Sequence, residues 1–139
     1  MRWWDLQAIA ALERVTYVHE PWSPESFWGE LAAGHSYFVD EESGSMVGYA
    51  GLAVIQDEGY IQTVAVDPAH RGSGRGSLLV DRLLAAAKAR GARTVGLEVA
   101  SRNDSARRIY LTRGFTEVGL RRGYYVSEGD DAVLMSVTL

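Results

Sequence analysis

The first part of the chain repeats its apolar positions with the period of an α-helix. The pattern covers about residues 5–14 and is made by Leu6, Ile9, Ala10, Leu12 and Glu13. Asp5 is placed to cap this helix. A second helix is expected from Ser23, as its N-cap, and Pro24, as its first residue, to about Gly34.

The middle of the chain changes to the shorter period of β-strands. Apolar runs at residues 37–39 and 46–55 flank turn residues at 42–45, which predicts a hairpin. Another turn at 57–59 leads into an apolar run at 60–66. We therefore expect three consecutive antiparallel strands.

Helical spacing returns after Gly76 and continues to Gly91, a residue type that often follows the end of a helix. A strand over residues 94–99 comes next, and then a short helix that Asn103 or Asp104 caps. Strand, helix and strand here form a right-handed crossover. This half of the sheet is therefore expected to be parallel.

The end of the chain holds two more strand candidates, around residues 116–125 and 133–139, joined by a turn-rich stretch at 127–131. The predicted order is ααβββαβαββ, an α+β arrangement in which helices flank a mixed central sheet. A length of 139 residues with 47% hydrophobic composition suits one domain, residues 1–139.

Gly72, Gly74 and Gly76 alternate along the segment that leads into the third helix. Amides at a helix N-terminus bind anions, and glycines let a phosphate approach them closely. A P-loop needs a lysine after its last glycine, where this chain has Ser77. A dinucleotide-binding turn needs its third glycine at that same position, and residues 67–71 lengthen the turn. The alternative to an anion site is a merely flexible loop.

Composition removes several kinds of site. The chain has no cysteine, and His19, His35 and His70 lie far apart, so we expect neither a disulfide nor a metal site. The net charge of -4 argues against a broad nucleic-acid interface, although arginines are frequent in the last third, namely Arg102, Arg107, Arg108, Arg113, Arg121 and Arg122. The sequence contains no signal peptide or membrane-spanning run, so we expect a cytoplasmic protein that does not bind membranes.

The glycine segment resembles the acetyl-CoA motif of the GNAT N-acetyltransferases. The segment reads Val64-x-Val66-x-Pro68-x-x-Arg71-Gly72-x-Gly74-x-Gly76. Within it, Arg71, Gly74 and Gly76 match the family pattern Arg/Gln-x-x-Gly-x-Gly/Ala in register. The resemblance implies the GNAT fold, with acetyl-CoA as co-substrate and no metal.

Nearly the whole chain is similar to the RimI branch of that family, the ribosomal-protein alanine N-acetyltransferases. The features that carry the similarity are Glu13, Pro21-Trp22-Ser23, Leu97-Glu98-Val99, Asn103, Ala106, Tyr110, Gly114-Phe115, Arg121 to Tyr125, Asp131-Ala132 and Met135. The branch usually reads Leu-Glu-Val-Arg-x-Ser-Asn, and this chain has Ala100 in place of the arginine. We expect that difference to affect contacts with the peptide more than the chemistry.

The resemblance also implies which residues hold acetyl-CoA. The amides of residues 72–77, with Arg71, would bind the pyrophosphate at the helix N-terminus. The strand at 64–66 would pair with the pantetheine arm and supply an N–H donor to the oxyanion. The position of Asn103 predicts a helix N-cap, whereas the resemblance implies that it contacts the cofactor. The expected cofactor residues are Val64, Ala65, Val66, Arg71, Gly72, Ser73, Gly74, Arg75, Gly76, Ser77 and Asn103.

Two residues are candidates for proton transfer. Because Val95, Leu97 and Val99 alternate toward one face of their strand, Glu98 points to the other face. The resemblance implies that Glu98 takes the proton of the amine and that Tyr110 donates one to the departing thiolate. An ordinary exposed carboxylate and a core tyrosine are the alternatives.

Three aromatic residues are candidates for the acceptor side. Trp22, Tyr124 and Tyr125 lie on predicted loops or strand ends, where they would form a wall of a peptide groove. Together with the resemblance, they predict acetylation of a protein N-terminus, the N-terminal alanine of a ribosomal protein. A small-molecule amine, a lysine side chain, or binding of acyl-CoA without catalysis are the other candidate functions.

Overall fold

The computed structural model describes residues 1–16, 22–125 and 130–139. In these residues the helices are α1 (Leu6–Thr16), α2 (Pro24–Ala32), α3 (Arg75–Ala89) and α4 (Asp104–Thr112). The strands are β1 (Ser36–Glu42), β2 (Ser45–Ile55), β3 (Glu58–Val66), β4 (Thr94–Ala100), β5 (Thr116–Tyr125) and β6 (Asp130–Thr138). The order is the one expected, with short 3-10 turns added at Trp3–Asp5 and Pro68–His70.

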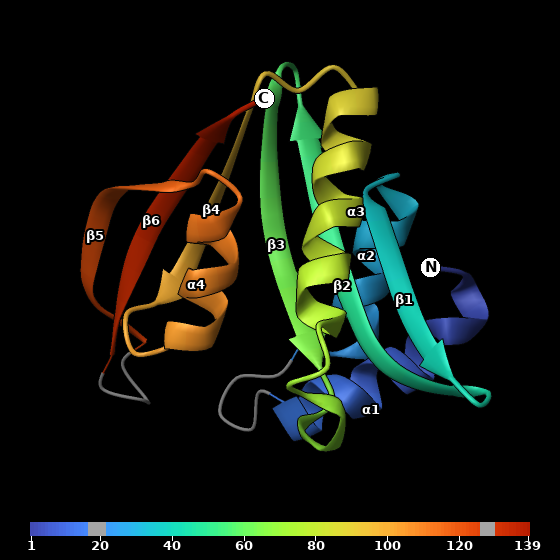
Figure 1. Ribbon diagram of the computed structural model, residues 1–139. Helices are drawn as coiled ribbons and strands as arrows, with labels where there is room; N and C mark the ends of the chain where they lie inside the picture. The colour runs from blue at the N-terminus through green and yellow to red at the C-terminus, as the bar shows by residue number, and fades with distance from the viewer. Residues whose placement is uncertain (17–21, 126–129) are drawn as a thin grey trace.

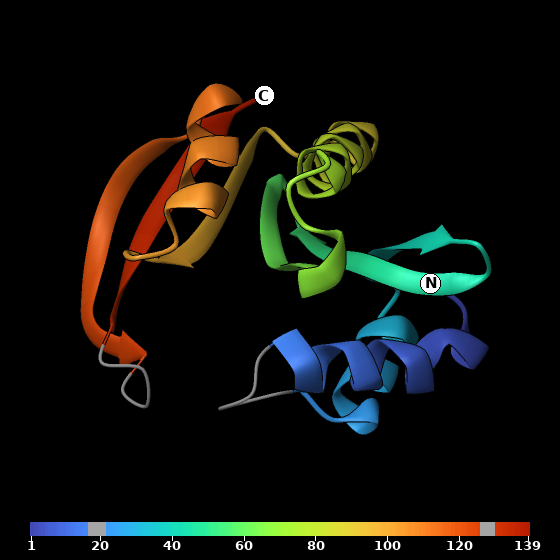
Figure 2. The same ribbon diagram turned by 60° about the horizontal axis from the view of Figure 1, so that its bottom comes forward.

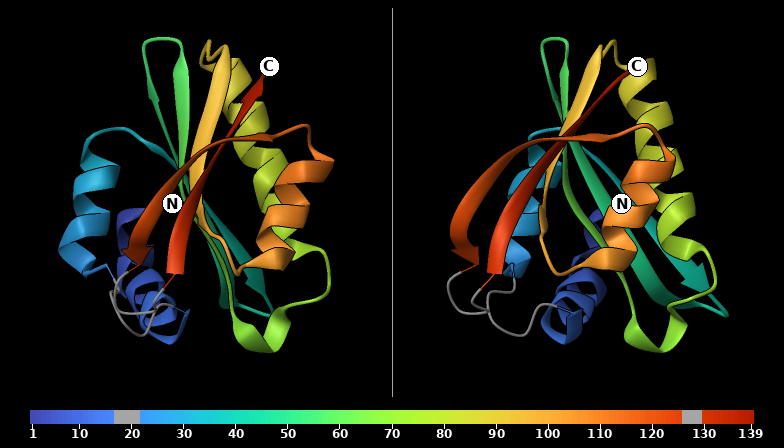
Figure 3. Two further views of the ribbon diagram at one scale, coloured as in Figure 1. Left: turned by 90° about the vertical axis from the view of Figure 1, so that its left-hand side faces the viewer. Right: turned by 60° about the vertical axis from the view of Figure 1, so that its left-hand side comes forward.

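The six strands form one mixed sheet in the order β1-β2-β3-β4-β6-β5 (Figure 1). Helices α1 and α2 cover one face of the sheet, and α3 and α4 cover the other, as the two views of Figure 3 show. The molecule therefore has three layers, with the sheet in the middle. No helix in the described part of the chain is both long and apolar enough to cross a membrane.

One expectation about the sheet was wrong. The second half is not parallel, because β6 lies between β4 and β5 and runs antiparallel to both. Strands β4 and β5 do run in the same direction on either side of α4, as a crossover requires, but they are not neighbours. Among the described strands the parallel pair is β3 with β4. The last strand inserts there because it gains hydrogen-bonding partners on both of its edges.

The helix ends follow capping residues in the sequence. Ser23 accepts the backbone N–H of Ser26 at the start of α2, and Asn103 accepts that of Ala106 at the start of α4. Asp5 differs from the expectation. Its carboxylate accepts the backbone N–H of Arg2, so it closes the turn before α1 instead of capping the residues that follow.

Each face of the sheet has its own apolar layer. The layer under α3 and α4 includes Leu52, Leu79, Leu83, Val95, Leu97, Val99, Tyr110 and Phe115. The layer under α1 and α2 is aromatic, and the ring of Phe27 meets those of Tyr37 and Tyr49 edge on, with centroids 6.3 and 5.6 Å apart. These two layers hold the strands that form the site in fixed positions.

Candidate active site

Strands β3 and β4 lie side by side at their amino ends and then separate. They pair over Glu58–Tyr60 and Thr94–Gly96. Beyond that point β3 follows β2 and β4 follows β6, so that the two halves of the sheet diverge (Figure 2). A bulge at Gln62, which lies between the residues that pair with Gly51 and Leu52, bends β3 where the separation begins. In open sheets with helices, ligands bind at the carboxyl ends of parallel strands, where the chain order changes direction.

The glycine loop connects the carboxyl end of β3 to α3. Gly72 and Gly74 both have φ +82°, in the left-handed region that side chains other than glycine rarely adopt. Apart from the glycine itself and its two chain neighbours, no described atom lies within 4 Å of the position that a Cβ would take at either residue. Gly74 is the N-cap of α3 and provides no side chain to the first turn. The first amides of α3 are therefore accessible to an anion.

Gly76 is small for a different reason. It lies inside the first turn of α3, and a Cβ there would be 3.3 Å from Cδ1 of Ile109 on α4. The residue thus allows the first turn of α3 to pack closely against the second half of α4. Of the three glycines, two serve the backbone conformation of the loop and one serves helix packing.

The side chains of the loop bind the surrounding chain. Arg71 Nε donates to the carbonyl oxygen of Val66 at 3.1 Å, and Ser73 Oγ donates to that of His70 at 3.0 Å. The guanidinium of Arg75 turns toward β1, where it pairs with Asp40 at 2.9 Å. Because the side chain of Arg75 is engaged with β1, only its backbone amide is left for a ligand of the loop.

The two other groups of expected cofactor residues flank the divergence. Val64 and Val66 pack against the layer under α3 and α4, whereas Ala65 is buried in the layer under α1 and α2. Ser77 is partly buried in the first turn of α3. Asn103 uses its side-chain carbonyl oxygen for the cap of α4, which follows the carboxyl end of β4. These residues thus lie at or after the carboxyl ends of β3 and β4.

Glu98 and Tyr110 lie on opposite faces of β4. Val95, Leu97 and Val99 are buried under α3 and α4, so Glu98, whose side chain is 29% exposed, projects on the face that carries α1 and α2. Tyr110 is buried on α4, with its ring 5.5 Å from that of Phe115.

Trp22 lies on the face of Glu98, beside the start of α2. It is half-buried and packs against Phe27, with ring centroids 5.3 Å apart. The side chains of the two other expected substrate residues, Tyr124 and Tyr125, lie outside the described part of the structure. So does most of the turn expected at 127–131.

Glu13 is the residue that sequence reasoning undervalued. Glu13 lies in α1 and is 4% exposed, and its Oε1 accepts the backbone N–H of Trp22, 3.3 Å away. Oε2 is also buried and has no hydrogen-bond partner among the described residues. Burial raises the pKa of Glu13 to about 7, against a small lowering by the Trp22 N–H. A signal existed, because Glu13 occupies an apolar-stripe position of α1 together with Ile9.

Three of the six arginines of the last third form ion pairs among the described residues. Arg113 pairs with Asp81 at 2.7 Å and joins α4 to α3, Arg107 pairs with Glu117, and Arg121 pairs with Glu98 at 3.3 Å. In the described residues, no three histidine or carboxylate side chains lie close enough to hold a metal ion.

Comparison with known proteins agrees with this geometry. Residues 3–115 match the acetyltransferase (GNAT) family. The N-alpha-acetyltransferase RimI of Mycobacterium tuberculosis is 42% identical over 137 residues, which cover 94% of this chain and 85% of that protein. The crystal structure of the ribosomal-protein-S18-alanine N-acetyltransferase from Escherichia coli has a TM-score of 0.90 at 31% identity, and the match covers 99% of this chain and 90% of that one.

A more distant acetyltransferase from Salmonella typhimurium, solved with its cofactor acetyl-CoA, shares the fold with a TM-score of 0.87 at 23% identity. That match covers 100% of this chain and 91% of the other. The family match and the shared fold agree with the glycine loop and the diverging strands described above. The chain belongs to the GNAT acetyltransferase family and is an N-acetyltransferase of its RimI-like branch.

Proposed function

We propose that this enzyme transfers the acetyl group of acetyl-CoA to the N-terminal α-amine of a ribosomal protein whose first residue is alanine. The observation that carries the proposal is the divergence of β3 and β4, with the glycine loop at its edge and Glu98 and Tyr110 on its two sides. The names of the RimI relatives support the choice of acceptor. Residues 1–139 act as one domain in this proposal, and the ribosomal acceptor implies a cytoplasmic reaction.

The glycine loop is suited to hold a pyrophosphate. Gly72 and Gly74 leave open space where a side chain would stand, and a phosphate fits such a space next to helix amides. The amides of residues 72–77 and the guanidinium of Arg71 would bind it, with Asn103 nearby. The backbone of residues 64–66 would hold the pantetheine arm between the strands. No metal is needed, because helix amides and arginine supply the positive field.

Glu98 and Tyr110 divide the proton transfers of the reaction. Glu98 accepts a proton from the α-ammonium group, directly or through water, and the neutral amine then attacks the thioester carbonyl. A backbone N–H of residues 64–66 stabilises the oxyanion. The attack forms the C–N bond, and collapse of the oxyanion then breaks the C–S bond. Tyr110 donates its phenolic proton to the thiolate, and the attacking nitrogen loses its second proton through solvent, from which the phenolate is reprotonated. Acetylated amine and CoA are the products.

The acceptor approaches from the face that carries α1 and α2. Glu98 projects on that face, and Trp22 lies there beside α2. We assign Trp22, Tyr124 and Tyr125 to the wall of the groove that holds the first residues of the protein. Ala100 takes the place of the usual arginine and Arg102 follows two residues later, so the arginine of the branch has moved or been lost in this wall.

A peptide screen tests the acceptor. Peptides that differ only in their first residue, and that all contain one internal lysine, are incubated with acetyl-CoA and analysed by tandem mass spectrometry. We expect acetyl on the α-amine of the alanine peptide, and none when that amine is blocked beforehand. Acetyl found only on the lysine side chain, or turnover only of free polyamines, would contradict the proposal.

A further inference from the structure

One carboxylate from β1 contacts both ends of the glycine loop. Glu42 Oε2 lies 3.1 Å from His70 Nε2, and Glu42 Oε1 lies 3.1 Å from Arg75 Nη2. His70 precedes the loop residues 71–74, and Arg75 follows them. A single side chain therefore joins the two points between which the loop is suspended.

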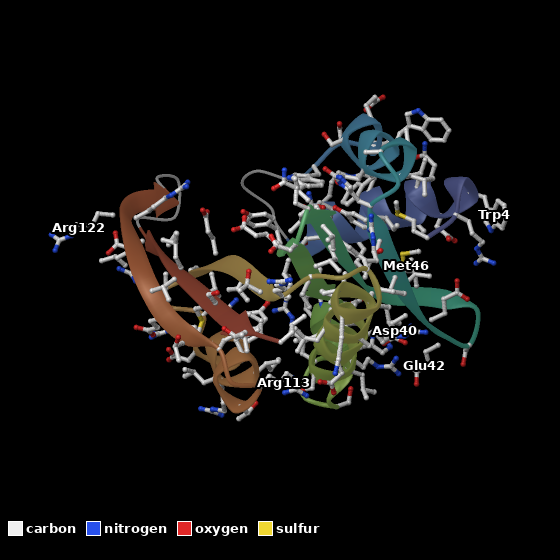
Figure 4. The ribbon with its side chains drawn as sticks, turned by 90° about the horizontal axis from the view of Figure 1, so that it is seen from above. Trp4, Asp40, Glu42, Met46, Arg113 and Arg122 are labelled. Atoms are coloured by element: carbon white, nitrogen blue, oxygen red, sulfur yellow. The ribbon has the colours of Figure 1, made fainter. Side chains whose placement is uncertain are left out.

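Each end of the loop has a second attachment. Asp40, on the same strand as Glu42, lies 2.9 Å from Arg75 Nη1. At the other end Asp67 accepts the backbone N–H of Ala69, and its own N–H donates to the carbonyl oxygen of Val47 at 2.8 Å. Figure 4 shows Asp40 and Glu42 beside α3, at the end of the molecule opposite Arg122. The loop is thus fastened to the β1–β2 hairpin at both of its ends.

Such fastening has a physical purpose in a glycine loop. Gly72 and Gly74 restrict their backbones less than any other residue would, so the loop by itself samples many conformations. An anion gains affinity from amides that are already in place, since less ordering accompanies binding. Fixing the distance between residues 70 and 75 reduces the freedom of the segment between them.

We propose that Glu42 is a positioning residue for acetyl-CoA, which acts by holding His70 and Arg75 and so the span of the glycine loop. The proposal rests on the assignment of the pyrophosphate to that loop. Glu42 does not touch the cofactor in this scheme. It affects CoA binding only through its contacts with His70 and Arg75 at the two ends of the loop.

The test is the affinity for CoA of the Glu42→Gln variant, measured by calorimetry without any acceptor. We expect its Kd to rise about three- to tenfold, because the contacts are partly exposed and such pairs are individually weak. Glu41→Gln is the matched control. It removes the same charge from the neighbouring residue of β1, whose contact is with Arg2 at 3.6 Å, and it should bind CoA within about twofold of the wild type.

A comparison of two acetyl donors separates positioning from general damage. With acetyl-CoA, Glu42→Gln should raise KM and leave kcat nearly unchanged. With S-acetyl-pantetheine, which has no pyrophosphate, the variant and the wild type should have equal kcat/KM. A loss that is the same for both donors would show that the variant harms the whole enzyme, and it would overturn the proposal.

The variant His70→Ala, alone and combined with Glu42→Gln, tests whether the two residues act together. We expect the two losses in CoA binding free energy not to add, because each substitution removes the same contact between Glu42 and His70. The double variant should therefore bind CoA more tightly than the sum of the two single losses predicts. Equal CoA affinity in wild type, Glu42→Gln and Glu41→Gln would overturn the positioning role. Failure of the wild type itself to bind CoA would instead overturn the cofactor site on which that role rests.

Discussion

Arg121 Nη2 lies 3.3 Å from Glu98 Oε1, and the pair spans β6, because Arg121 is on β5 and Glu98 on β4. The guanidinium is 55% exposed, so water and salt weaken the pair. An incoming ammonium group must share or displace this arginine in order to reach the carboxylate. The candidate base is therefore held in place by a partner that an acceptor amine can compete with.

Removing the carboxylate should damage the chemistry but not cofactor binding. In Glu98→Gln we expect kcat to fall by about 10²- to 10⁴-fold, the usual contribution of a general base. The Kd of CoA should be unchanged, because Glu98 is on β4 and is not part of the glycine loop. Part of the activity should return at alkaline pH, where an α-amine with a pKa of about 8 loses its proton to solvent. Steady-state rates and calorimetry measure these effects.

Glu117→Gln is the control for that experiment, since it removes an exposed carboxylate from β5 that pairs with Arg107. We expect it to retain most of the wild-type kcat. Full activity in Glu98→Gln would show that another group accepts the proton.

Loss of the phenol at Tyr110 should slow the departure of the thiolate. Tyr110→Phe keeps the ring against Phe115, so the change in stability should stay near 1 kcal/mol. We expect kcat to fall by about 10²-fold or more, the usual contribution of a general acid. Tyr60→Phe, which removes an exposed hydroxyl bound to Glu58, is the control. Equal kcat in Tyr110→Phe and Tyr60→Phe would contradict the role of Tyr110 as the acid.

Glu13 should make the protein less stable as the pH rises. Its pKa is about 7 in the folded state and near 4.5 in the unfolded chain, so between these values the folded state holds a proton that the unfolded state has released. The free energy of unfolding should therefore fall across that window by about 3 kcal/mol and level off above pH 7. Urea denaturation at pH 4.5, 6 and 8 would measure it.

The matched variant is Glu13→Gln, whose amide oxygen can still accept the N–H of Trp22. Its stability should vary less over the same window, so that it exceeds the wild type at pH 8 and not at pH 4.5. Parallel pH profiles for the two proteins would show that Glu13 is not the group that titrates.

Gly51→Ala should disrupt the pairing of β2 with the edge strand β1. A Cβ at this residue of β2 would overlap the ring of Tyr37, which crosses the glycine from β1. We expect a loss of about 3 kcal/mol or more, at the upper end for an overpacked core. The companion change Tyr37→Leu should recover part of it. By contrast Gly29→Ala, on α2 with open space around it, should raise stability by up to about 1 kcal/mol in the same thermal unfolding experiment.

Local patterns were sufficient to predict most elements. The boundaries of α2 and α4 follow from Ser23 and Asn103, since a cap acts on the residues next to it in sequence. The alternation around Glu98 predicted its face for the same reason. Asp5 was misjudged because a carboxylate can close the turn on either side of it. The parallel arrangement of the second half was wrong because a crossover fixes the direction of a strand and not its neighbour.

The sequence by itself determined the elements, their order and the glycine loop that leads into α3, because periodicity, caps and glycine conformation depend on neighbouring residues. Only the tertiary structure decided that β6 separates β4 from β5, that Arg121 reaches Glu98, that Glu42 joins His70 to Arg75, and that Glu13 is buried. These contacts join residues far apart in the chain. Strand order and the packing of the layers bring these residues together, and local sequence patterns contain no information on either.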